Sequence, residues 1–174
     1  MIAESPRAEG APPEALSVLP EGIPHELKKR PQWVCWRYTR QGVKWTKHPY
    51  NPRTERKASS TDLMTWSRFE TVLDAYASGT YDGVGFVLSS GDPYVGVDLD
   101  GCRDPETGVI EGWAAEIVGE LDSYTELSPS GKGLHVLVKG KVPKALKLPR
   151  IEIYSMERFF TVTGHAIAVS GSSA

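Results

Sequence analysis

Short segments in which apolar side chains recur at every second position occur along most of this chain. The segments "YVGVDL", "LHVLVK" and "IEIY" each place aliphatic residues on one side of a strand and polar residues on the other. This alternation is typical of half-buried β-strands, because successive side chains of a strand point to opposite faces. Gly, Pro, Asp and Ser separate the segments, which favours short connections between neighbouring antiparallel strands.

The remaining pattern predicts a few helices among these strands. Two segments, 65–79 and 110–122, carry apolar residues at helical spacing, and 23–30 predicts a short helix at the start of the domain. Two strands are expected around a Gln41-Gly42 turn, and a hairpin with the turn "SGDP" is expected over 83–100. Further strands are expected over 123–128, 134–140 and 151–155, the last continuing into 158–164. The predicted fold class is α+β, with a mainly antiparallel sheet covered by helices on one face.

The chain has 174 residues, a length that supports one substantial domain. We expect a flexible tail over 1–20, the domain over 21–168 and a linker or end segment over 169–174. No apolar run reaches the roughly 18 residues that a membrane span needs, and the N-terminus has no secretory-signal pattern. Two cysteines far apart in the chain indicate neither a disulfide framework nor a zinc site. A cytoplasmic protein without a membrane partner is therefore expected.

The net charge of −2 hides a strong polarity along the chain. Half of the 20 Lys and Arg residues lie between Lys28 and Lys57, whereas acids dominate from Asp92 to Glu126. Aromatic residues are interleaved with the basic segment, at Trp33, Trp36, Tyr38, Trp45 and Tyr50. Such a segment can follow a phosphate backbone while its rings stack on bases. For most of these rings, however, a place in the core of a hairpin with a basic exposed face is the better interpretation.

Carboxylates and a histidine occupy the polar side of three predicted strands. Asp98 and Asp100 are two positions apart and share a face, about 6 to 7 Å from each other along the strand. The same alternation places His135 opposite Leu134, Val136 and Val138, and Glu152 opposite two isoleucines. Hard carboxylate oxygens suit Mg²⁺ or Mn²⁺, and an imidazole can meet a phosphate.

A glycine-rich loop, "SPSGKGLH", precedes His135. Main-chain N–H groups in such a loop can approach an anion closely, and Lys132 adds positive charge. The candidate nucleotide-binding residues of this loop are Ser130, Gly131, Lys132 and Gly133. The pattern is not a Walker A loop, and by itself it also fits an ordinary hairpin turn.

In combination, the motifs resemble those of the primase-polymerases of the archaeo-eukaryotic primase superfamily found in phages, plasmids and mobile elements. "VGVDLDGC", "SPSGKGLHV" and "IEIYSMERFFTVTGH" match its three motifs, with Glu152 where many members carry Asp. The resemblance implies an RRM-like catalytic unit joined to a smaller N-terminal α/β unit. It implies two-metal nucleotidyl transfer, with Asp98, Asp100 and Glu152 holding Mg²⁺ or Mn²⁺. It also implies a triphosphate clamp that contains the loop and His135, with Lys47 and Arg158 as further phosphate contacts.

The expected partners are a single-stranded DNA template, a primer strand and dNTPs or NTPs, with a helicase or helical accessory domain elsewhere. The expected role is replication of DNA or of a mobile element. Two alternatives stay open. One is a non-catalytic RRM-like module that binds single-stranded nucleic acid, although three carboxylates would repel phosphate. The other is another metal-dependent nucleotidyl- or glycosyltransferase.

Overall fold

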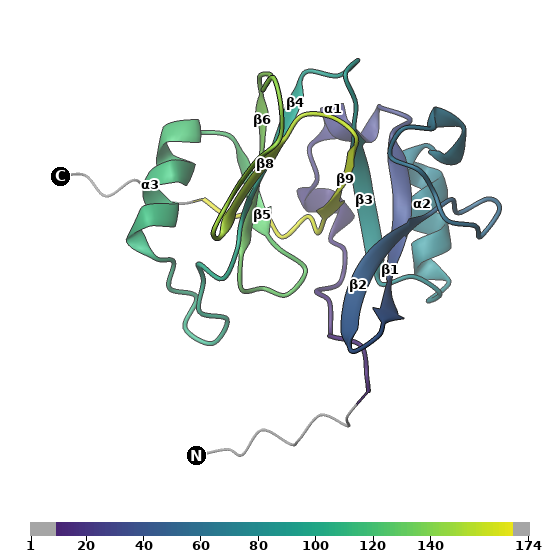
Figure 1. Ribbon diagram of the computed structural model, residues 1–174, viewed down its shortest axis with the longest axis horizontal. Coiled ribbons are helices and arrows are strands. Elements are labelled where there is room, and N and C mark those ends of the chain that lie inside the picture. The colour runs from purple at the N-terminus through teal and green to yellow at the C-terminus, as the bar shows by residue number, and fades with distance from the viewer. Residues whose placement is uncertain (1–9, 169–174) are drawn as a thin grey trace.

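The computed structural model describes residues 10–168, and its strands form two separate antiparallel sheets (Figure 1). Sheet A has the order β2-β1-β3-β9, and sheet B has the order β5-β6-β4-β8-β7. The strands of sheet A are β1 (Trp33–Gln41), β2 (Lys44–Tyr50), β3 (Gly83–Leu88) and β9 (Arg158–Val162). Those of sheet B are β4 (Tyr94–Leu99), β5 (Tyr124–Leu127), β6 (Leu134–Lys139), β7 (Leu146–Leu148) and β8 (Ile151–Tyr154). The predicted α+β class is confirmed.

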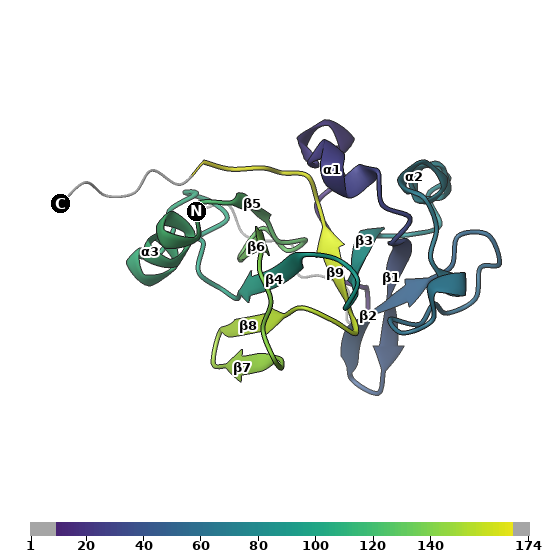
Figure 2. The same cartoon turned by 90° about the horizontal axis from the view of Figure 1, so that it is seen from above.

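Helices lie against both sheets, as Figures 1 and 2 show. They are α1 (His25–Lys28), α2 (Phe69–Ala77) and α3 (Gly112–Leu121), with short 3₁₀ turns η1 (Pro20–Gly22) and η2 (Leu63–Thr65). Trp33 of β1 packs edge-on against Phe69 of α2, with ring centroids 4.8 Å apart. Ala114 and Val118 of α3 are buried in the core of sheet B. Phe160 of β9 is in register with Phe86 and so shares the face of Trp33. It also contacts His135 of sheet B, so this face of sheet A packs against both α2 and sheet B. In the described residues, no helix is both long and apolar enough to cross a membrane.

The predicted hairpin over 83–100 is wrong, because β3 belongs to sheet A and β4 to sheet B. The turn itself forms around Asp92, whose buried carboxylate accepts hydrogen bonds from the main-chain N–H groups of Ser89 and Tyr94 and from the Gln32 amide. Both edges of β3 are already occupied, by β1 and β9, so β4 passes on to the second sheet. The strand pattern alone predicted one sheet, and the structure has two because β4 starts a new sheet.

The predicted continuation of 151–155 into 158–164 is likewise wrong. β8 pairs in sheet B, and β9 pairs with β3 in sheet A. The chain crosses between the sheets at Ser155–Glu157, where Glu157 has a φ of 56°. This second crossing, together with the one at Asp92, holds the two sheets side by side.

The N-terminal residues that the structure describes run along the body of the protein. The N–H of Leu16 donates to the Pro129 carbonyl at 2.8 Å, and Val18 is buried in the core of sheet A. Positions 1–9 and 169–174 lie outside the described residues. The predicted domain limits therefore stay a prediction.

Candidate active site

One row of polar side chains crosses sheet B from edge to edge. Cross-strand pairing sets Glu126 opposite His135, His135 opposite Asp98, Asp98 opposite Glu152, and Glu152 opposite Lys147. Residues directly opposite each other in a sheet lie on the same face. The common face predicted for Asp98, His135 and Glu152 is thereby confirmed. This face is not open to solvent along its whole length, since sheet A covers the end that holds Glu126 and His135.

A cavity of about 210 Å³ lies where the row meets sheet A. Sheet A contributes Lys47 from β2 and residues of β9, and sheet B contributes residues of β4, β6 and β8. The lining residues are Lys47, Asp98, His135, Glu152, Tyr154, Arg158, Phe159, Phe160 and Thr161. Five of the predicted site residues, from segments far apart in the sequence, therefore line the same cavity.

Asp98 has the least satisfied carboxylate in this cavity. Its Oδ1 atom is buried without a hydrogen-bond partner, and the nearest cationic atom recorded is Nε2 of His135 at 3.6 Å. Burial raises the pKa of Asp98 above its ordinary value, and the positive charges of His135 and Lys47 oppose this rise only in part. Asp98 thus presents an acceptor atom that a cation can satisfy.

Lys47 is the corresponding cation on the sheet A side. It lies across from Tyr38 in the strand register, with its ammonium 5.7 Å from the Trp36 ring centroid. Burial lowers the pKa of Lys47, while the charges of Asp98 and Asp100 act in the opposite direction. A partly buried ammonium that shares a cavity with partly buried carboxylates favours ligands that carry both signs of charge, such as a phosphate with its metal ion.

Of the other two predicted carboxylates, Glu152 has a side-chain partner, whereas Asp100 is positioned through its main chain. Oε1 of Glu152 lies 2.6 Å from Nζ of Lys147, a side chain that is 80% exposed. Asp100 directly follows β4, and its N–H donates to the Arg150 carbonyl at 2.8 Å. Across residues 10–168, no three His, Cys, Asp or Glu side chains are arranged to hold a metal ion. The donor chemistry nevertheless fits a hard divalent ion, because Oδ1 of Asp98 lacks a partner and Glu152 is held only by an exposed lysine.

The glycine-rich loop lies beside the end of β4 and does not line the cavity. A Cβ atom added at Gly133 would lie 2.6 Å from the Leu99 carbonyl oxygen, so only glycine allows this close approach. The loop is tied to itself by Ser128, whose Oγ accepts from the Gly133 N–H at 3.1 Å and pairs with Ser130 Oγ at 3.2 Å. Lys132 is exposed, and Gly131 has a φ of 71°. The structure thus places this loop next to Asp100 rather than over Asp98.

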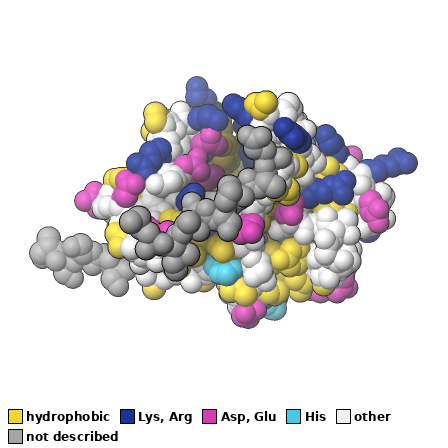
Figure 3. Space-filling view, turned by 90° about the horizontal axis from the view of Figure 1, so that it is seen from below, with side chains coloured by type: hydrophobic (Ala, Val, Ile, Leu, Met, Phe, Trp, Pro, Cys, Tyr) yellow, Lys and Arg dark blue, Asp and Glu magenta, His cyan; other side chains and the backbone are white. Residues whose placement is uncertain are grey.

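A larger hollow of about 470 Å³ is present elsewhere on the molecule. Its lining includes Arg53, Met64 and Trp66 but no acidic side chain. It offers no carboxylate oxygen for a metal ion, so we assign the candidate site to the smaller cavity. Figure 3 shows Lys and Arg side chains along the upper edge of the molecule, over parts of both sheets, and at the right side, where sheet A lies.

Comparison with known proteins relates this geometry to an enzyme. No family model matches the chain. A curated protein of Nitratiruptor phage NrS-1, named DNA Primase-polymerase, is 40% identical over 145 residues. The chain is thus similar to a part of this phage DNA primase-polymerase. The match covers 79% of this chain and 20% of the phage protein, so the chain spans about a fifth of that relative's length. The primase-polymerase resemblance carried by the three motifs is confirmed.

Glu126 is a residue of the polar row across sheet B that the motifs did not indicate. It is 1% exposed and lies directly opposite His135. A signal was present in the sequence, because Glu126 is a carboxylate in the middle of the predicted strand 123–128. Its side chain points to the face opposite that of Thr125 and Leu127. Lys147 was missed for a different reason, since the pattern predicted no strand at β7.

Proposed function

We propose that this chain carries the nucleotidyl-transfer site of a DNA primase-polymerase, which makes phosphodiester bonds from dNTPs or NTPs in the replication of DNA or of a mobile element. One observation carries the proposal. Asp98, His135 and Glu152, from three neighbouring strands of sheet B, line one cavity with Lys47 of sheet A. The relationship to the phage primase-polymerase supports the same reaction class.

In this proposal, Asp98, Asp100 and Glu152 hold two divalent ions, Mg²⁺ or Mn²⁺. Such ions, when bound, supply Lewis acidity to the attacking 3′ hydroxyl and neutralise charge on the leaving pyrophosphate. Asp98 contributes the unpartnered Oδ1 atom. Glu152 contributes its carboxylate after leaving Lys147, a side chain that is itself largely exposed and can return to solvent.

The cationic residues of the site bind the phosphates. Lys47 reaches the cavity from sheet A, and Arg158 lies at its rim with its guanidinium 5.0 Å from the Tyr154 ring. The exposed Lys132 side chain and the Ser130 N–H offer a second anion-binding surface beside Asp100. The N–H groups of Gly131 and Gly133 already donate to Ser128 and would bind an anion only if the loop rearranges. Small-molecule pockets commonly measure about 300 to 1,000 Å³. A cavity of about 210 Å³ therefore suits the phosphate part of a nucleotide and leaves the sugar and base outside.

The template strand, in this proposal, follows the β1–β2 hairpin away from the cavity. Tyr38 pairs with Lys47, and Arg40 pairs with Trp45, so these four side chains share one face of sheet A. Tyr38 and Trp45 are partly exposed, whereas Trp33, Trp36 and Tyr50 are buried in the protein. Partly exposed rings that alternate with cations suit a single strand, with bases on the rings and phosphates on the cations.

Initiation of a new chain is proposed to need more than this region. The phage relative is about five times as long as the part that matches, and a helicase or a helical accessory domain is the proposed partner for unwinding and priming.

Extension of a labelled DNA primer on a single-stranded template, with Mg²⁺ or Mn²⁺, tests the proposal. The test variant is Asp98→Asn/Asp100→Asn, and the control is Glu116→Gln/Glu120→Gln, which removes the same charge from the exposed side of α3. We expect extension to fall at least about 10³-fold in the test variant and to stay unchanged in the control. No extension and no metal-dependent nucleotide binding by the wild type would reject the proposal in favour of a non-catalytic nucleic-acid-binding module.

A further inference from the structure

Glu126 is a buried carboxylate to which the proposed reaction assigns no role. It lies on β5 at the junction of the two sheets and is 1% exposed. Burying a carboxylate is costly unless hydrogen bonds satisfy it. A residue of this kind, next to a candidate active site and without contact to the cavity, needs a structural or positioning explanation.

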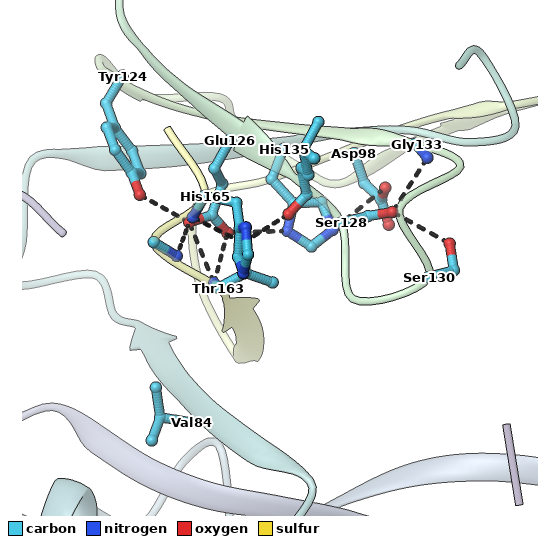
Figure 4. A network of polar contacts seen from close by, with 12 residues as sticks. Val84, Asp98, Tyr124, Glu126, Ser128, Ser130, Gly133, His135, Thr163 and His165 are labelled. Carbon is cyan, nitrogen blue, oxygen red and sulfur yellow. Dashed lines mark hydrogen bonds and ion pairs between the residues drawn. The ribbon is translucent and has the colours of Figure 1, made fainter. Parts of the chain in front are cut away.

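Donors from both sheets surround the Glu126 carboxylate (Figure 4). Oε2 accepts from the Gly164 N–H at 2.8 Å, from the Tyr124 hydroxyl at 2.7 Å and from the Thr163 N–H at 3.1 Å. Oε1 accepts from the same Thr163 N–H at 3.0 Å and lies 3.3 Å from Nδ1 of His135. Because main-chain N–H groups can only donate, both oxygens act as acceptors here.

This arrangement decides which nitrogen of His135 carries the hydrogen. An acceptor oxygen faces Nδ1, so Nδ1 has to donate its hydrogen to Glu126. Nε2 then points towards the cavity, 3.6 Å from Oδ1 of Asp98. The Phe160 ring packs against the imidazole with a centroid distance of 4.6 Å, which limits rotation of the ring. The orientation of His135 thus depends on groups from both sheets.

We propose that Glu126 is the positioning residue of His135. It holds Nδ1 as a hydrogen donor and so leaves the lone pair of Nε2 facing the cavity, where it can accept a hydrogen bond or bind a cation. Through Thr163 and Gly164, the same carboxylate ties this orientation to the end of β9 and hence to sheet A. This inference rests on the proposed function only for the identity of the group that Nε2 meets, since the orientation itself follows from the contacts.

The substitution Glu126→Gln makes the proposal specific. The amide oxygen has to take the place of Oε2, because the Gly164 N–H can only donate there, whereas a hydroxyl such as that of Tyr124 can also accept. The NH₂ group then faces Nδ1 of His135, which has to become an acceptor. Glu126→Gln is therefore expected to move the hydrogen from Nδ1 to Nε2. Tyr124→Phe is the matched control, because it removes one donor to Oε2 and leaves the contact between Oε1 and His135.

Two measurements on the full chain test the proposal. Ring ¹⁵N NMR shifts at about pH 8.5, where an ordinary imidazole is neutral, identify the tautomer, with His135→Asn assigning the signal. We expect the Nδ1–H form in the wild type and in Tyr124→Phe, and the Nε2–H form in Glu126→Gln. Steady-state primer extension is expected to show kcat lowered about tenfold to a hundredfold in Glu126→Gln, with the KM for primer-template unchanged.

The two measurements separate failure of this inference from failure of the proposed function. An Nε2–H tautomer in the wild type would overturn the positioning proposal even if Glu126→Gln does not fold. An unchanged tautomer in a folded Glu126→Gln protein, or an equal loss of kcat in Tyr124→Phe, would also overturn it. A wild type that shows the Nδ1–H tautomer but no polymerase activity would uphold the role of Glu126 and reject the proposed reaction.

Discussion

Sheet A and sheet B are alike in architecture but opposite in what they bring to the cavity. Both are antiparallel, and a helix packs against each, α2 on sheet A and α3 on sheet B. Sheet A brings Lys47 and a hairpin with basic and aromatic side chains, whereas sheet B brings Asp98 and Glu152. A lysine of the basic segment 28–57 and an aspartate of the acidic segment 92–126 thus line the same cavity. A cavity between opposite charges suits a ligand that has both a cation and a phosphate.

The glycine-rich loop tests whether sheet B requires a fixed geometry at the end of β4. Gly133→Ala would place a Cβ atom 2.6 Å from the Leu99 carbonyl oxygen, so the loop or the strand end beside Asp100 has to move. We expect the free energy of unfolding to fall by about 1 to 3 kcal/mol. Primer extension is expected to fall by about tenfold or more, because small displacements of positioned groups are costly. Urea unfolding and the extension assay measure the two effects.

Gly119→Ala is the matched control for that substitution. Gly119 lies in α3, and an added Cβ atom would meet no atom within 4 Å. Alanine is favoured over glycine in a helix by about 1 kcal/mol, so this variant is expected to be slightly more stable and fully active. Equal behaviour of the two variants would contradict a special requirement for glycine at 133.

The β1–β2 hairpin tests the nucleic-acid role of sheet A. Arg40 and Lys44 are both exposed, but Arg40 shares the face of Lys47, whereas Lys44 pairs with Gln41 on the opposite face. Arg40→Ala is expected to weaken binding of single-stranded DNA severalfold and to reduce the slope of log K against log salt by about 0.7. Lys44→Ala is expected to change neither. Fluorescence anisotropy titrations at several salt concentrations measure both, and equal losses would refute a face-specific track.

The smallest expected effect concerns the energetic cost of the buried lysine. Burial lowers the pKa of Lys47 below its ordinary value of 10.5, so the unfolded chain binds this proton more tightly than the folded chain does. Stability therefore rises with pH between the lowered pKa and 10.5. Without metal or nucleotide, Lys47→Met is expected to be more stable than the wild type at pH 7, with a difference that shrinks towards about pH 10. A difference that grows with pH in urea unfolding would contradict this assignment.

Alternation along single strands predicted much of the site. It placed Asp98, His135 and Glu152 on a common face, because the period of two is local and a buried face enforces it. The same phase includes Glu126, whose partners Thr163 and Gly164 are far away in sequence and are not signalled by any local pattern.

The assignment of strands to two sheets could not be derived in this way. The turn at Asp92 has the residues of an ordinary hairpin turn, and only the occupied edges of β3 send β4 to another sheet. Such competition between edges is a long-range property. The position of Lys47 is also a long-range property. Lys47 lies near Asp98 because the two sheets pack together, and no local pattern in β2 or β4 predicts this contact.

The acids of sheet B and Lys47 of sheet A are proposed to act on one bound nucleotide. A double-mutant cycle with Asp98→Asn and Lys47→Met, measured as kcat/KM for dNTP in metal-dependent primer extension, tests this proposal most directly. The account predicts strong coupling, with the double variant losing little more than the more damaging single variant. Effects that multiply independently would show that the two sheets do not share a substrate and would contradict the account.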